Sequence, residues 1–410
     1  LKPLSLKLRA IFSFCAQVQC HHLRTMLLGN VLSPEGLDHI AGHKYVAGKY
    51  TPLDNLLNGW WLSLAESLPT WLAPNLVTLL GFLPIVICYV LMWFTAPSYE
   101  DPAPRPLAIL TALAVFFYQT MDAVDGKQAR RTGSSTPLGQ LFDHGCDCLA
   151  CLSHHSVATM IFLPGGSLWG AAGLAALQTG FFMAQWQEYH TGVLRTSFGP
   201  VGVTEVQFSL MAGASVAGLV GPERLRSWIH SKTLLPWSQE ALPHGIILIQ
   251  GWTVFMAVLM LISIAKTLNT AHQNGGTSGI FSATLQLTPI VALDMCLFFV
   301  WDASAYSLCA RKVCFLTGIL FFFYTAQMIL FSMAKMRFPE FQLGTLAPYA
   351  ALALSSRILS NVQIDIALTV ASVLAGVWVL LWLCRVVSEL KEKLGIYAFT
   401  LQKFEQKKSD

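Results

Sequence analysis

The stretch Asp122-Ala-Val-Asp-Gly-Lys-Gln-Ala-Arg130 is followed, eight residues later, by Gly139-Gln-Leu-Phe-Asp-His-Gly-Cys-Asp147. Together they carry four carboxylates, which belong to Asp122, Asp125, Asp143 and Asp147. On helices, acidic residues three or four apart project from one face, so the two pairs can converge across a helical hairpin. Converging carboxylates repel one another unless a cation lies between them, and hard oxygen ligands suit Mg²⁺, Mn²⁺ or Ca²⁺. The stretch therefore predicts a metal site for a phosphate ester.

The composition around this stretch is that of a membrane protein. Of the 410 residues, 54% are hydrophobic and 12% are charged, and the mean hydropathy is +0.55. A soluble domain is about one quarter charged. The chain is therefore predicted to be an all-α polytopic membrane protein. A net charge of +4 gives no reason to expect nucleic acid as a partner, and it suits a lipid bilayer.

Apolar runs of nearly bilayer length predict about ten transmembrane helices. The ninth run contains Pro348 and is the shortest. The runs are 74–94, 107–121, 141–163, 168–186, 203–220, 246–265, 284–301, 313–334, 343–355 and 364–384.

Basic residues predict how the chain is oriented. With ten spans, 19 of the 26 Lys and Arg residues fall on the side that holds both termini. By the positive-inside rule, that side is the cytosol, so the acidic motif is expected at the cytosolic membrane face. The segment 4–28 mixes Lys and Arg with apolar residues, and we interpret it as an interfacial amphipathic helix rather than a targeting segment.

The acidic motif resembles the signature of the CDP-alcohol phosphotransferase family. Its fixed positions, at the family's spacings, are Asp122, Asp125, Gly126, Ala129, Arg130, Gly139, Asp143 and Asp147. The text around the signature is similar to the eukaryotic choline and ethanolamine phosphotransferase branch, as are Leu-Ala-Pro-Asn-Leu-Val-Thr from Leu72 and Ile-Tyr-Ala-Phe-Thr-Leu from Ile396. Gln140 departs from the Glu expected in that branch, at a position outside the signature.

The resemblance implies an enzyme that transfers a phosphoalcohol from CDP-ethanolamine or CDP-choline to diacylglycerol and releases CMP. It also implies two Mg²⁺ or Mn²⁺ ions held by the four aspartates, a six-helix catalytic bundle, a homodimer, and a place in the endoplasmic reticulum or Golgi membrane. We accordingly expect an N-terminal interfacial segment (1–70), a catalytic bundle (71–270), C-terminal scaffold helices (271–390) and a cytosolic basic tail (391–410).

The resemblance further implies which residues bind the nucleotide. Arg130 is suited to a bidentate phosphate contact, whereas Lys127 is either a phosphate contact or an interfacial charge. The small residues at 126 and 129 serve either helix packing or the approach of a nucleotide to the backbone. Arg131 is interpreted as an interfacial anchor. The candidates for cofactor or nucleotide binding are Asn75, Thr78, Asp122, Gly126, Lys127, Ala129, Arg130 and Gly139.

Two residues compete for the role of general base. His144 is adjacent to Asp143, and an imidazole has a near-neutral pKa suited to accept a proton from an alcohol. Asp147 is the alternative, and we favour His144 slightly. Glu188, His190 and Glu205 either flank the head group or cap helices. The sequence suggests no partner for the carboxylates of Asp294, Asp302 and Asp365.

Other interpretations of the chain compete with this one. Cys146, Cys148 and Cys151 lie near two histidines, but on a continuous helix they are expected to pack in the core rather than bind zinc. An inositol or glycerol phosphate acceptor enzyme is disfavoured by chain length. A transporter could also hold intramembrane carboxylates, but these four lie at one membrane edge. For the head group, Pro-Thr-Trp-Leu-Ala-Pro-Asn and Ile-Tyr-Ala-Phe resemble the ethanolamine enzymes, whereas Val-Thr-Glu-Val-Gln resembles the choline or dual-specificity enzymes. We favour ethanolamine slightly.

Overall fold

The structure is a computed structural model, and it describes residues 30–97, 99, 103–162, 168–198, 201–234, 241–301 and 306–401. The predicted amphipathic helix at 4–28 and the carboxylate of Asp302 lie outside this range. Within the described residues, the helices are accompanied by two short antiparallel strand pairs. These pairs are β1 (Ser197–Phe198) with β2 (Val201–Gly202), and β3 (Lys232–Leu234) with β4 (Ala241–Pro243).

Each predicted apolar run lies largely on a helix. The helices are α2 (Pro34–Ala41), α3 (Pro52–Ser67), α4 (Pro74–Thr95), α5 (Arg105–Arg131), α6 (Pro137–Phe162), α7 (Leu168–Thr191), α8 (Val203–Val220), α9 (Pro222–His230), α10 (His244–Leu285), α11 (Thr288–Trp301), α12 (Tyr306–Ala334), α13 (Leu343–Ser355) and α14 (Asn361–Leu394). The helix α10 breaks at Gly276, whose positive φ of 59° is a conformation that glycine tolerates.

Length and composition qualify six helical segments of the described chain as able to cross a membrane. The class of all-α membrane protein is confirmed, whereas the count of ten spans stays a prediction. Helix α13, which carries the shortest run, is not among the six. Its 13 residues cover roughly 20 Å, whereas a bilayer core is about 30 Å thick. The six segments are α4, α5, α8, Gln250–Trp301, α12 and α14.

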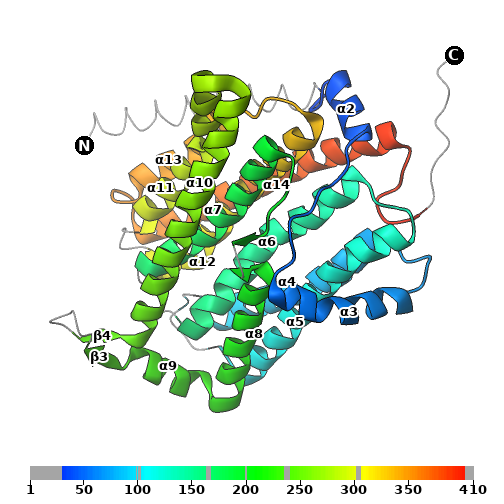
Figure 1. The fold of residues 1–410 in the computed structure, drawn as a ribbon. Coiled ribbons are helices and arrows are strands. Elements are labelled where there is room, and N and C mark those ends of the chain that lie inside the picture. The colour runs from blue at the N-terminus through cyan, green and yellow to red at the C-terminus, as the bar shows by residue number, and fades with distance from the viewer. Residues whose placement is uncertain are drawn as a thin grey trace, which may run out of the picture.

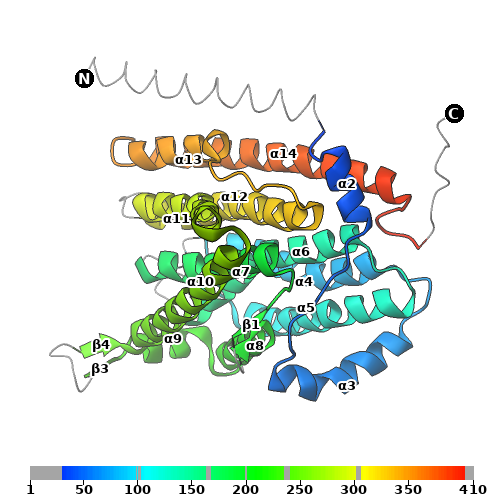
Figure 2. The same cartoon turned by 45° about the horizontal axis from the view of Figure 1, so that its top comes forward.

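The helices pack in layers (Figure 1). Helix α5 packs against α4, α8 and α3, and α6 packs against α4 and α12. Figure 2 shows α13 and α14 on one side of the molecule and α3 on the opposite side. Helix α12 contacts α6, α7, α11 and α14. The most apolar 18 residues of α12 are 94% buried inside the protein. Helix α12 therefore lies in the core, between α14 and the helix α6 of the motif.

Two non-helical segments run beside the motif. The first connects α2 to α3, and it pairs with the chain after α7, where the Gly48 N–H donates to the Leu194 carbonyl at 2.7 Å. Thr51 then starts α3 with a capping box that includes Asp54. The second segment follows α14, which ends at Gly395 in the left-handed conformation. Both segments bring residues that are distant in sequence to the ends of α4 and α6.

Candidate active site

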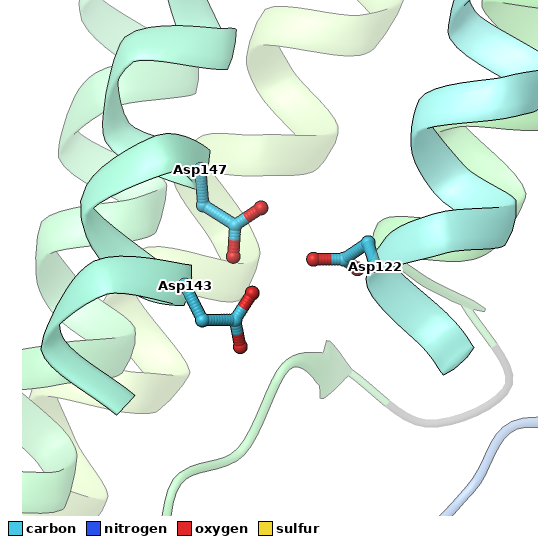
Figure 3. Close-up of side chains that lie close together, drawn as sticks. All are labelled: Asp122, Asp143 and Asp147. Atoms are coloured by element: carbon cyan, nitrogen blue, oxygen red, sulfur yellow. The ribbon is translucent and has the colours of Figure 1, made fainter. Parts of the chain in front are cut away.

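Three of the four predicted aspartates meet between two helices. Asp122 comes from α5, and Asp143 and Asp147 come from successive turns of α6. Figure 3 shows their carboxylates pointing toward one another. One oxygen of each lies within 4.8 Å of the others. The convergence that the sequence predicts is therefore present for these three residues.

This group has the properties of a site for a divalent cation. Its donors are carboxylate oxygens, which suit Mg²⁺ or Mn²⁺ rather than softer metals. The Asp143 Oδ1 atom is buried and has no hydrogen-bond partner in the described part of the chain. A buried carboxylate oxygen without a partner is costly, and a bound cation would offset that cost. The residues present thus fit the metal that the motif implies.

Asp125 lies outside this group of three, although it is buried on the same helix as Asp122. Its Oδ2 atom accepts a hydrogen bond from the Thr78 hydroxyl of α4. The role of Thr78 as a nucleotide contact stays a prediction, and in the structure its hydroxyl donates to Asp125. The pair fixes the rotamer of Asp125 and links α4 to α5.

The two candidate bases have different environments. His144 is 6% exposed, and its Nε2 atom lies 3.9 Å from Asp143 Oδ2. Its Nδ1 atom has no hydrogen-bond partner in the described structure. Asp147 accepts a hydrogen bond at Oδ1 from the Tyr118 hydroxyl, one turn before Asp122 on α5. One oxygen of Asp147 is therefore hydrogen-bonded to Tyr118, whereas the Nδ1 atom of His144 has no partner among the described residues and could accept a proton.

Several predicted nucleotide contacts line the ends of α4, α5 and α6. A Cβ atom placed on Gly139 would lie 3.4 Å from Asn75 Oδ1, so the start of α6 lies beside the start of α4. The Asn75 side chain donates to the Ala398 carbonyl at 2.7 Å. Gly126 and Ala129 are partly exposed, and a Cβ on Gly126 would lie 3.5 Å from a guanidinium nitrogen of the exposed Arg130.

Lys127 and Arg131 point toward α3. The Lys127 ammonium lies 5.3 Å from the ring centre of Trp61 and 5.5 Å from that of Tyr50, and the side chain is buried. Arg131 donates to the carbonyls of Ala65 and Leu68 at 3.1 and 2.7 Å, so these carbonyl groups at the end of α3 have hydrogen-bond donors. In the structure, these two cations hold α3 against α5.

A polar cluster lies one turn before His144 on α6. The Gln140 side chain contacts His43 at 2.9 Å through its oxygen, and it donates to Glu188 Oε1 at 3.2 Å through its nitrogen. The Tyr45 ring packs edge-on against His144, with ring centres 5.9 Å apart. Burial raises the pKa of the Tyr45 hydroxyl, and the charges of Glu188 and Asp143 raise it further.

Glu188 lies beyond the apolar run of α7. Burial raises its pKa to about 7, and the hydrogen bond from Gln140 opposes that shift. Its neighbour His190 faces away from the cluster and contacts Gln286 at 2.9 Å. Glu205 caps α8 by accepting from the Gly202 N–H at 2.7 Å. Of the three residues considered for the head group, Glu188 alone lies in this cluster.

Two carboxylates without a predicted partner have one in the structure. Asp294 accepts from the Thr179 hydroxyl at 2.7 Å, and Asp365 pairs with Lys312 at 2.6 Å. The cysteines Cys146, Cys148 and Cys151 are buried free thiols, as core packing requires.

Sequence reasoning did not identify Tyr45, Tyr118 or Ala398 at the site. Tyr118 could have been found, since it precedes Asp122 by four residues and so shares its helix face. Tyr45 and Ala398 lie on non-helical segments, and no periodic pattern marks them.

Comparison with known proteins agrees with this geometry. The sequence profile described as CDP-alcohol phosphatidyltransferase matches residues 71–237, which include both halves of the acidic motif. The Dictyostelium discoideum protein described as uncharacterized CDP-alcohol phosphatidyltransferase class-I family protein 2 is 30% identical over 294 residues, covering 71% of this chain and 67% of its own.

Two cholinephosphotransferases are similar over a shorter range. Cholinephosphotransferase 1 of Xenopus laevis is 37% identical over 195 residues, which are 47% of this chain and 48% of its own. The Homo sapiens protein of the same name is 38% identical over 195 residues, or 45% of each chain. The chain thus spans about half the length of these two relatives. With the profile, the longer match and the acidic cluster taken together, the chain belongs to the CDP-alcohol phosphatidyltransferase class-I family.

Proposed function

We propose that this protein transfers phosphoethanolamine or phosphocholine from the matching CDP-alcohol to diacylglycerol, releasing CMP. The observation that carries the proposal is the group of three converging carboxylates, set between two helices of an apolar protein. Intramembrane acidic residues are costly and are kept for function. Family membership and the similarity to cholinephosphotransferases support the same reaction class.

Asp122, Asp143 and Asp147 would hold the divalent ion, with Asp125 beside them, and two ions are expected from the family resemblance. When bound, such ions supply positive charge that neutralises the pyrophosphate and the departing CMP. The part of Thr78 is to fix Asp125, and that of Tyr118 is to fix Asp147. Fixed carboxylates require no rearrangement when substrate arrives.

His144 is proposed as the general base. Its partnerless Nδ1 atom can accept the hydroxyl proton of diacylglycerol as the hydroxyl oxygen attacks the β-phosphorus, in line with the leaving CMP. Asp143, 3.9 Å from Nε2, stabilises the imidazolium that results. Asp147 is the alternative base, but its hydrogen bond from Tyr118 favours a ligand role.

The nucleotide is proposed to lie at the ends of α4, α5 and α6. Arg130 is exposed there and offers a guanidinium for a phosphate, while Gly126, Ala129 and Gly139 leave space at the backbone. Asn75 is placed to contact the nucleotide only through its amide oxygen, since its nitrogen binds the Ala398 carbonyl. Lys127 is retained as a proposed phosphate contact that would have to leave the rings of Tyr50 and Trp61.

The wider setting follows from the sequence. We propose residues 71–270 as the catalytic bundle, 271–390 as scaffold helices that provide a dimer contact, and 1–70 and 391–410 as interfacial and cytosolic segments. The division of basic residues supports an active site that faces the cytosol. The family resemblance supports the endoplasmic reticulum or Golgi membrane as its location.

A reconstituted assay tests the proposal. Purified protein in detergent is given diacylglycerol, Mg²⁺ and radiolabelled CDP-ethanolamine or CDP-choline, and lipid product is counted. The expected result is formation of labelled phosphatidylethanolamine or phosphatidylcholine. A transporter would instead accumulate label inside sealed vesicles without forming lipid. Product formed only with inositol or glycerol phosphate as acceptor would place the protein in another branch of the family.

A further inference from the structure

Glu188 is a buried acid that the proposed transfer does not use. It is 4% exposed, and only its Oε1 atom has a partner, the Gln140 amide at 3.2 Å. Its Oε2 atom is buried without a hydrogen-bond partner in the described structure. No Lys or Arg of the described residues forms an ion pair with it. A buried carboxylate oxygen left this way is destabilising unless a ligand completes it.

The position of Glu188 is set by a chain of hydrogen bonds. Gln140 contacts His43 on one side and donates to Glu188 on the other, so its amide is fixed and the free oxygen of Glu188 is held in place. Gln140 precedes Asp143 by three residues on α6, a rise of roughly 5 Å along the helix. A two-carbon head group attached to a phosphate at the aspartates spans a distance of that order.

We propose that Glu188 binds the primary ammonium of the donor's head group and makes the protein prefer CDP-ethanolamine over CDP-choline. A primary ammonium has three N–H donors, and Oε2 is an unused acceptor with a negative charge. A quaternary ammonium has no N–H donor and favours aromatic faces. The inference rests on the proposed function, because it assigns the specificity of that same site.

A purely structural role explains Glu188 less well. A helix-capping acid would bind backbone N–H groups, as Glu205 does at Gly202, whereas Glu188 lies near the end of α7 rather than at its start. Tyr45 also lies over this cluster from a separate segment, with its ring against His144. Glu188 therefore belongs to the proposed site rather than to the exposed surface of α7.

Glu188→Gln tests the inference, because it removes the charge and keeps the shape. Direct binding of radiolabelled CDP-ethanolamine to the purified protein in Mg²⁺ is expected to weaken by about 10-fold or more, the usual worth of a charge-assisted hydrogen bond. Binding of CMP, which lacks the head group, should be unchanged. CDP-choline should weaken less than CDP-ethanolamine. In the transfer assay, the KM for CDP-ethanolamine should rise more than kcat falls.

Glu223→Gln is the matched control, since Glu223 is an exposed acid of α9 and its change to an amide should alter none of these values. Unchanged CDP-ethanolamine affinity in Glu188→Gln would overturn the inference, and so would an equal loss for CMP, which would indicate a structural role. If the unaltered protein binds CDP-ethanolamine without transferring it, the proposed function fails while the binding comparison still decides the role of Glu188.

Discussion

Replacement of His144 by alanine tests which residue takes the proton. General-base catalysis contributes about 10²- to 10⁴-fold, which corresponds to roughly 2.7 to 5.4 kcal/mol of the activation barrier. The structure favours His144 as the base that supplies this contribution, because its Nδ1 atom has no hydrogen-bond partner among the described residues. We therefore expect kcat to fall by about 10²- to 10⁴-fold in His144→Ala.

The fall in kcat must be distinguished from a loss of activity that results from lower stability of the fold. His144 is 6% exposed, so its removal leaves a cavity and destabilises the protein by about 1 to 3 kcal/mol. His155→Ala is the matched control. His155 is a 2% exposed imidazole on the same helix, and it packs against Tyr99, with ring centres 5.8 Å apart. Thermal stability should fall similarly in both variants, while kcat should fall only in His144→Ala.

The assay is steady-state transfer to diacylglycerol, with CMP binding in Mg²⁺ measured in parallel. CMP binding should persist in His144→Ala because the carboxylates remain, and raising the pH should partly restore turnover. Near-parental kcat in His144→Ala, with a large loss in Asp147→Asn, would refute the reasoning and make Asp147 the base.

Three further outcomes are expected. Asp122→Asn and Asp143→Asn should each abolish transfer, as should EDTA in the unaltered protein, with activity restored by Mg²⁺ or Mn²⁺; activity that persists in chelator would contradict the metal assignment. In sealed microsomes of native orientation, and without accessible native cysteines, an impermeant maleimide should label cysteine placed at Ser134 but not at Ser227; the reverse labelling would invert the orientation. CDP-ethanolamine should bind more tightly as the pH rises through about 7, because burial keeps Glu188 protonated below that pH; the dependence should vanish in Glu188→Gln, and a pH profile unaffected by that change would contradict the assignment.

Part of the convergence of Asp122, Asp143 and Asp147 could be predicted, because a spacing of four residues places Asp143 and Asp147 on one face of α6. That Asp122 of α5 meets them depends on how the two helices are placed. Asp125 shows the limit of that argument. Three residues along a helix leave side chains about 60° apart, so Asp125 turns toward α4 and is met there by Thr78. The neighbouring helix decides the partner, and no spacing within α5 reveals it.

The cluster around Glu188 could not be predicted for a related reason. Gln140 and His43 are 97 positions apart, and Gln140 and Glu188 are 48 apart. Their meeting depends on how an extended segment crosses α6, and local sequence preferences carry little information about such a path. The number of spans is hard to predict for the same reason. Hydropathy is calculated for each helix alone, but neighbouring helices determine whether polar residues in α6, or the short length of α13, can be accommodated in a membrane.

The contact of the chain's far end with the motif has a consequence for biosynthesis. Asn75 on α4 binds the carbonyl of Ala398, and Phe142 on α6 packs against Phe399, with ring centres 5.4 Å apart. During translation, α4, α5 and α6 leave the ribosome long before these partners exist. The contacts that Ala398 and Phe399 make beside the motif therefore form only after α14 has been made. A nascent chain that already contains the four aspartates of the motif still lacks these contacts.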